Sequence, residues 1–203
     1  MNRIENLAKG YLTPSLKKSG FKKKKLSWNR NRGSFIDVIE IQESKGSVHG
    51  CERFTINIGV FIPSFYELVW NEPYKGFVKE VDCVVRFRLG ALLQEDFTGK
   101  ALDTWWDLEA DEDVDKTGVE LKSDLEGKVL PFLDSMSDLN HLHDFIDDMA
   151  GWQQQYPLMQ IYFALIKNSL GDKECSVNIL NDLISGKNQA WADRAKKVAS
   201  ALP

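Results

Sequence analysis

The feature that most constrains this chain is a regular alternation of apolar and polar residues in two segments. Residues 54–61 read FTINIGVF, and residues 81–89 read VDCVVRFRL. In each segment apolar residues recur at every second position, so a strand would turn them to one side. Such alternation is typical of antiparallel strands that have one face on a core and the other toward water.

Two further runs, 21–28 and 34–44, complete an expected antiparallel sheet of about four strands. The connections at 29–33 and 45–53 contain Gly, Ser and Asn and suit hairpin loops. They leave no room for the crossover helices that parallel strands require. The sequence therefore predicts an α+β fold with an N-terminal helix, this antiparallel sheet and a C-terminal helical half.

Helical periodicity appears at both ends of the chain. Residues 2–19 predict a helix that Pro14 interrupts, with either a kink or a new start near Thr13 as N-cap, and with an end at Gly20. Five later helices are expected, at 119–133, 139–152, 157–170, 173–184 and 189–202. We therefore expect an α+β domain over 1–135 with a helical extension over 136–203, or one single domain.

Composition excludes several protein classes. A chain of 203 residues with 43% hydrophobic residues can bury a core without disulfides or metals. It has no run of 18 apolar residues, so no membrane span is expected. Its three widely spaced cysteines form no disulfide or metal-binding pattern and indicate reduced thiols in a cytoplasm. A Cys51–His49 catalytic pair is disfavoured, because neighbours in sequence are seldom catalytic partners.

The net charge of -4 hides a polarised chain. Residues 1–53 contain twelve Lys and Arg against five acidic residues, a charge of +7. Residues 94–148 contain seventeen acidic residues against four Lys, a charge of -13. This polarity favours docking to a partner more than it favours chemistry.

The acidic residues are densest in one stretch, which is interpreted as a solvated loop or as an interaction patch for a basic partner protein. Its members are Asp107, Glu109, Asp111, Glu112, Asp113 and Asp115. Three of the aspartates have the spacing of calcium-loop ligands, but Lys116 and Lys122 stand where Gly and Glu are required. We therefore expect no metal site.

The basic residues form a cluster for which the sequence leaves two interpretations open. The cluster is Lys17, Lys18, Lys22, Lys23, Lys24 and Lys25. It can track nucleic-acid phosphates, but only Phe21 and Trp28 lie nearby for base stacking, so nucleic-acid binding is disfavoured. It can also be a solvated surface that protects an edge strand from aggregation.

A third candidate is a polar, cationic sheet face that could bind a small anion. It comprises Asn57, Arg86 and Arg88, with Trp105 nearby. The alternative is a solvated outer face, covered by acidic side chains from 94–115. No catalytic motif selects any residue as catalytic, and no cofactor is expected.

Several of these segments carry a family pattern. The end of the first helix carries Leu16, Lys17, Gly20 and Phe21, the end of a strand carries Gln42 and Ser44, and residues 54–57 read FTIN before Gly59. Over about residues 1–135 the chain resembles the bacterial domain-of-unknown-function family 4304. That family has no assigned activity, so the resemblance implies a fold and a bacterial cytoplasmic setting but no catalytic residue.

The leading functional expectation is a non-enzymatic interaction protein, immunity-like or accessory, whose acidic stretch meets a basic partner protein. The alternatives are a small-ligand binder or enzyme that uses the cationic sheet face, and nucleic-acid binding through the lysine cluster. The sequence does not determine the oligomeric state.

Overall fold

The computed structural model describes residues 2–46, 50–97, 103–136, 138–148 and 156–202. Their contacts divide the chain into two compact units. The first contains residues 1–61 and 77–135, and the second contains residues 62–76 and 136–203.

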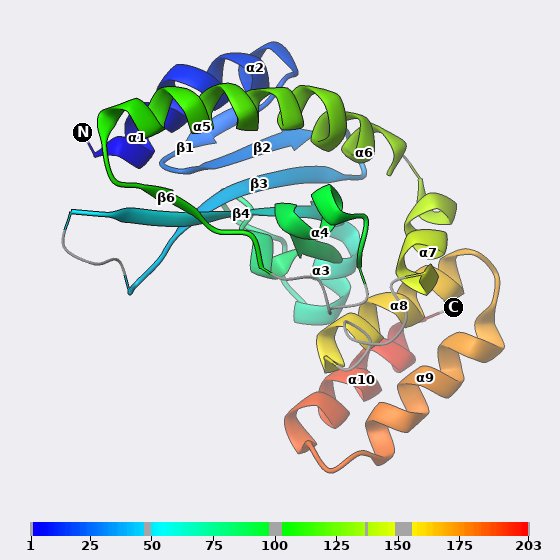
Figure 1. Ribbon diagram of the computed structural model, residues 1–203. Coiled ribbons are helices and arrows are strands. Elements are labelled where there is room, and N and C mark those ends of the chain that lie inside the picture. The colour runs from blue at the N-terminus through cyan, green and yellow to red at the C-terminus, as the bar shows by residue number, and fades with distance from the viewer. Residues whose placement is uncertain (1, 47–49, 98–102, 137, 149–155, 203) are drawn as a thin grey trace. The chain divides into compact units, whose positions relative to one another are not determined.

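The first unit is built on a six-stranded antiparallel sheet in the order β1-β2-β3-β4-β5, with β6 also paired to β4 (Figure 1). The sequence therefore underestimated the number of strands. Their bounds are β1 Lys22–Lys24, β2 Ser27–Asn31, β3 Ile36–Glu43, β4 Glu52–Phe61, β5 Val85–Arg88 and β6 Trp106–Leu108.

The two faces of this sheet differ in chemistry, as the alternation predicts. One cross-strand row consists of Trp28, Ile39, Ile58 and Phe87, all at most 4% exposed. Helices of the same unit cover this apolar face, and α1, α2 and α5 lie over it in Figure 1. The adjacent row on the opposite face consists of Ser27, Glu40, Asn57 and Arg88.

The strand expected over 81–89 is shorter than predicted. Residues Glu80–Asp82 form a 3₁₀ turn, η2, and β5 begins only at Val85. Cys83 therefore does not share a strand face with Val85; its buried side chain lies against Gly59 of β4 instead. A Cβ at position 59 would come within 2.6 Å of the Cys83 sulfur, so this close approach requires glycine.

The N-terminal helix accommodates Pro14 without a new start. It runs through α1 Arg3–Leu7, the π-helical turn η1 Ala8–Leu12 and α2 Thr13–Lys18. Thr13 is not an N-cap, since its backbone is helical and its hydroxyl donates to the Ala8 carbonyl at 2.6 Å. The wider π turn offers a route past a proline that has no N–H to donate. The helix ends before Gly20, whose φ is +88°, as the sequence predicts.

A second helix of the first unit begins earlier than expected. It consists of α5 Asp111–Asp124, the π turn η3 Leu125–Val129 and α6 Leu130–Ser135. Its π turn also ends two residues before a proline, Pro131. Much of the acidic stretch is therefore helical and not a loop. This placement is favourable, because the N-terminus of a helix stabilises carboxylates. A short helix not expected from the sequence, α4 Leu89–Gln94, follows β5.

The second unit is helical. It contains one helix not expected from the sequence and four near the expected positions; the expected residues 149–152 lie outside the described ranges. Their bounds are α3 Pro63–Trp70, α7 Leu139–Asp148, α8 Pro157–Ser169, α9 Lys173–Ser185 and α10 Gln189–Ala201. Arg194 of α10 donates to the Val69 carbonyl at 2.7 Å, and its guanidinium carbon lies 3.9 Å from the Trp70 ring centroid. These contacts join residues far apart in sequence.

Candidate functional site: the lysine surface

All six arginines of the first unit contact a carboxylate. Arg3 contacts Asp111 at 3.1 Å, and Arg53 contacts Asp107 at 3.5 Å. The remaining four are Arg30, Arg32, Arg86 and Arg88. The positive charge that arginine brings to this unit is therefore matched internally.

The most buried of these ion pairs surrounds Asp37 on β3. Its side chain is fully buried and accepts from Arg30 Nε and Arg32 Nη2, each at 2.7 Å. Arg30 also donates to the exposed Asp134 at 2.7 Å. Burial raises the pKa of Asp37, and the two guanidinium groups oppose that shift. Asp37 and its two arginines thus form a desolvated structural contact, and the two guanidinium groups have little access to a ligand.

The expected anion-binding face also has partners within the chain. Asn57 donates to Gln42 at 2.9 Å, Arg86 contacts Glu80 at 3.1 Å, and Arg88 contacts Asp103. The Trp105 ring centroid lies 5.1 Å from the guanidinium carbon of Arg88. A ligand at this face would have to compete with each of these contacts.

Residues 77–80 cover part of the same face. The Asn29 side chain donates to the Val78 carbonyl at 3.1 Å and accepts from the Val78 N–H at 2.8 Å. Glu80 follows and is 8% exposed. Burial raises the pKa of Glu80; Arg86 opposes this shift and Glu40 adds to it. The polar face is therefore partly sealed and not fully solvated.

The acidic stretch is also largely engaged. Asp113 accepts from the N–H groups of Glu109 and Ala110 at 2.8 Å each, which lowers the pKa of its carboxyl. Asp115 accepts from the Tyr11 hydroxyl at 2.6 Å. With Asp107 and Asp111 in ion pairs, four of the six acidic residues have partners in the chain. The other two, Glu109 and Glu112, are exposed.

Cys51 donates from its thiol to the Asp107 carboxylate at 3.6 Å. Burial and the neighbouring Asp107 raise the pKa of its thiol, which disfavours the thiolate. His49 lies outside the described residues, so the disfavoured Cys–His pairing has no geometry here.

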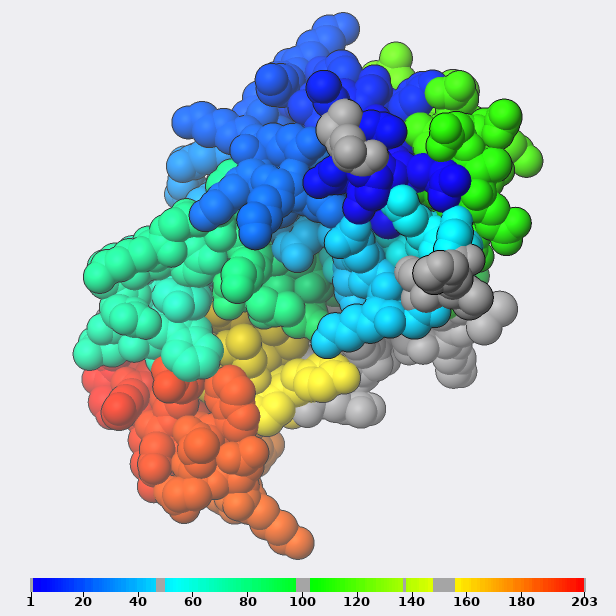
Figure 2. Space-filling model, turned by 90° about the vertical axis from the view of Figure 1, so that its left-hand side faces the viewer, coloured from blue at the N-terminus to red at the C-terminus, as the bar shows by residue number. Residues whose placement is uncertain are grey.

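The lysines of the N-terminal region differ from the arginines. Seven of them form what we call the lysine surface: Lys9, Lys17, Lys18, Lys22, Lys23, Lys24 and Lys25. All seven are exposed, and none forms an ion pair with a described carboxylate. The N-terminal quarter of the chain, blue in Figure 2, forms a continuous part of the surface on this side of the first unit. Unmatched positive charge is therefore concentrated here.

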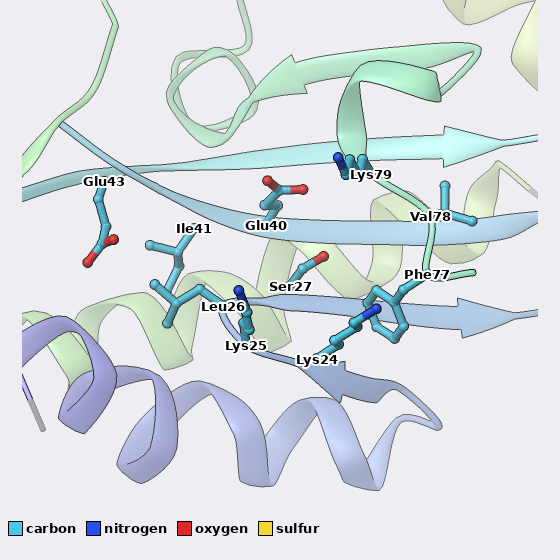
Figure 3. Close-up of a pocket in the computed structure, with 10 residues that line it drawn as sticks. All are labelled: Lys24, Lys25, Leu26, Ser27, Glu40, Ile41, Glu43, Phe77, Val78 and Lys79. Carbon is cyan, nitrogen blue, oxygen red and sulfur yellow. The ribbon is translucent and has the colours of Figure 1, made fainter. Parts of the chain in front are cut away.

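Two hollows adjoin the lysine surface. The helix hollow, of about 830 Å³, lies between the N-terminal helix and the β1–β2 hairpin, and its cationic walls are Lys9, Lys17, Lys23 and Lys25. The sheet hollow, of about 450 Å³, lies over the polar sheet face (Figure 3). Lys25, at the β1–β2 turn with φ +55°, lines both hollows.

Sequence reasoning missed two lysines of this region. Lys9 joins the cluster because the helix carries it to the same hollow as Lys17. Lys79 lines the sheet hollow, although it lies more than fifty residues from Lys25 in the chain. Helical spacing could have suggested Lys9. No local signal marks Lys79, since only tertiary folding places it beside the hairpin.

The aromatic residues near the cluster are not exposed. Phe21 is 3% exposed and Trp28 is fully buried, with the Lys23 ammonium 5.2 Å from a Trp28 ring centroid. Burial lowers the pKa of Lys23. These two rings therefore offer no stacking surface for bases.

Among the described residues, no helix combines the length and the apolar composition that a membrane span requires.

Comparison with known proteins identifies the family and nothing finer. Neither a curated protein nor a solved structure gives a significant match. A family model described as "Domain of unknown function (DUF4304)" matches residues 12–135. This match spans more than half of the 203 residues and includes the sheet and the lysine surface apart from Lys9, so the chain belongs to the DUF4304 family.

Proposed function

We propose that this protein is a non-enzymatic interaction protein that binds an acidic segment of another protein through its lysine surface. One observation carries the proposal. Seven exposed lysines form no ion pair with a described carboxylate, whereas every arginine of the same unit contacts one. Unmatched charge at a surface steers an oppositely charged partner and sets its orientation.

The acidic stretch supports a basic partner less well. Four of its six carboxylates already accept hydrogen bonds or form ion pairs within the chain. A basic partner, including the toxin that an immunity-like role would require, would have to displace those contacts. We therefore favour the lysine surface as the docking site.

A protein partner fits this surface better than nucleic acid does. The nearby rings of Phe21 and Trp28 are buried, so they are unavailable for base stacking. Glu5 and Glu43 also line the helix hollow and would repel a phosphate backbone. A polypeptide can place its own acidic residues beside the lysines and basic or polar residues beside these two glutamates.

We also assign the protein to the cytoplasm of a bacterium. Its three cysteines are free thiols, which is typical of a reducing compartment. The bacterial setting rests on the family resemblance.

The test is fluorescence anisotropy with a labelled oligo-glutamate peptide and with single- and double-stranded DNA of matched charge. We expect saturable peptide binding that weakens with salt. The variant Lys9→Ala/Lys17→Ala/Lys23→Ala should weaken it by about 10- to 100-fold. The matched control, Lys116→Ala/Lys122→Ala/Lys187→Ala, removes the same charge from exposed positions elsewhere and should leave the affinity near that of the original protein.

Two results would contradict the proposal. DNA that binds more tightly than the peptide at equal salt would identify nucleic acid as the partner class. Equal losses in the two triple variants would show that only the net charge matters and that the lysine surface is not a site.

A further inference from the structure

The sheet hollow has the dimensions and walls of a small-ligand site. Its volume of about 450 Å³ falls within the range of ligand pockets, roughly 300–1,000 Å³. Three parts of the first unit form it: the β1–β2 turn, β3 and residues 77–79 (Figure 3). The two hydrogen bonds between the Asn29 side chain and the Val78 backbone hold the last of these walls in place.

The charges around the hollow select a singly charged anion. Lys24, Lys25 and Lys79 line it, and none of the three forms an ion pair with a described carboxylate. Glu40 and Glu43 line it as well, which leaves a net charge of +1. A dianion such as phosphate would be repelled by the two carboxylates, whereas a monoanion balances the net charge.

The rest of the lining is amphipathic. Phe77, Val78, Leu26 and Ile41 supply apolar surface for the body of a ligand. The Ser27 hydroxyl is shielded from solvent and has no hydrogen-bond partner among the described residues. In Figure 3 it lies beside Glu40, its cross-strand neighbour. Buried polar groups normally have a partner, so this hydroxyl marks a bonding position that the chain itself leaves open.

We propose that the sheet hollow binds an organic monocarboxylate with an apolar body. The ammonium groups of Lys24 and Lys79 hold the carboxylate, Phe77 and Val78 contact the apolar body, and Ser27 supplies a hydrogen bond. This site shares Lys24 and Lys25 with the lysine surface, but the test of the proposed function changes Lys9, Lys17 and Lys23, none of which lines the sheet hollow. Either proposal can therefore fail while the other stands.

The test is an NMR titration of the ¹⁵N-labelled full chain with sodium 3-phenylpropionate. We expect saturable shifts confined to the amides of 24–27, 40–43 and 77–79. The neutral 3-phenylpropanamide and inorganic phosphate should each bind at least about fivefold more weakly. If either binds as tightly as the carboxylate, or if no saturable shift occurs, the proposal is wrong.

Variants link the binding to the named side chains. Lys79→Met keeps most of the side-chain volume and should weaken 3-phenylpropionate about fivefold, as should Lys24→Met, while Ser27→Ala should weaken it about twofold. Lys18→Met is the matched control, since Lys18 is exposed and lines neither hollow. Equal affinities for Lys79→Met, Lys24→Met and Lys18→Met would overturn the proposal, given unchanged spectra elsewhere.

A second pair of probes distinguishes the source of the carboxylate. One is a short peptide that ends in leucine with a free carboxylate, and the other is the same peptide with an amidated end. Tighter binding of the free-ended peptide than of 3-phenylpropionate, lost on amidation, identifies the C-terminus of a polypeptide. Equal or weaker binding of that peptide identifies a free small molecule.

Discussion

Two neighbouring regions of the first unit carry positive charge in different ways. Where β2 and β3 pair near Asp37, Arg30 and Arg32 share a fully buried carboxylate. On the lysine surface, seven exposed lysines have no described carboxylate partner. The first region is a structural contact, and the second is a charged surface that remains available to a partner.

The chemistry of the two side chains explains this division. A guanidinium is planar, presents several donors and sheds water readily, so it suits a buried, two-sided contact with a carboxylate. An ammonium is compact and strongly hydrated and remains at the surface at little cost. The +7 charge of residues 1–53 is therefore not a uniform property, because its four arginines are matched inside the unit and its cluster of lysines is not.

The largest expected effect comes from breaking the arginine region. Asp37→Ala leaves two half-buried guanidinium groups without their shared carboxylate and should lower the free energy of unfolding by about 3–5 kcal/mol. Urea denaturation measures this loss. The control is Asp134→Ala, which removes only the exposed partner of Arg30 and should cost less than about 1 kcal/mol. Similar losses in the two variants would show that burial does not distinguish this region.

An intermediate effect concerns Arg86, whose partner Glu80 is buried. The folded-state pKa of Glu80 lies above its ordinary value of 4.5, so the folded protein holds this proton more tightly than the unfolded chain. The resulting stabilisation is present below pH 4.5 and is lost as pH rises through the folded-state pKa. Glu80→Gln removes the titration.

Urea denaturation from pH 4 upward measures this effect. The stability of the original protein minus that of Glu80→Gln should fall as pH rises. A difference that increases with pH would instead mean that the Arg86 contact outweighs the burial of Glu80. The Arg86–Glu80 pair would then differ from the contact at Asp37, where burial raises the pKa of the carboxyl although two arginines oppose the shift.

The smallest effect is expected at the lysine surface. Removing three ammonium groups in Lys9→Ala/Lys17→Ala/Lys23→Ala breaks no described ion pair and relieves repulsion between like charges. The free energy of unfolding should change by less than about 1 kcal/mol, with any gain larger at low salt. A loss above about 2 kcal/mol would show that these lysines are structural and would end the contrast between the two regions.

Local pattern predicted much of the fold. The alternation in 54–61 located β4 and its apolar face, and Gly20 located the end of the first helix. The same reasoning failed at 81–84, where alternation continues but the chain forms a 3₁₀ turn. Periodicity alone does not reveal that Cys83 must pack against Gly59, which is a contact between distant residues.

The candidate site was predicted only in part. The run Lys22–Lys25 is visible in the sequence, and so is its excess of charge. For Arg88, the alternative of cover by acidic side chains from 94–115 included its partner Asp103. The partner of Arg86 was not predicted, because Glu80 lies outside both that range and the expected strand.

The sequence by itself determined the α+β class, the polarised charge and the family, because alternation, helical periodicity and composition are local properties of the chain. Only the tertiary structure decided which charges are matched, since ion pairs such as Arg3–Asp111 join residues more than a hundred positions apart. It also placed Lys79 beside Lys25 around one hollow and grouped residues 62–76 with the C-terminal helices. The physical reason is that neutralisation and enclosure depend on distances in space, and the spacing of residues along the chain does not specify them.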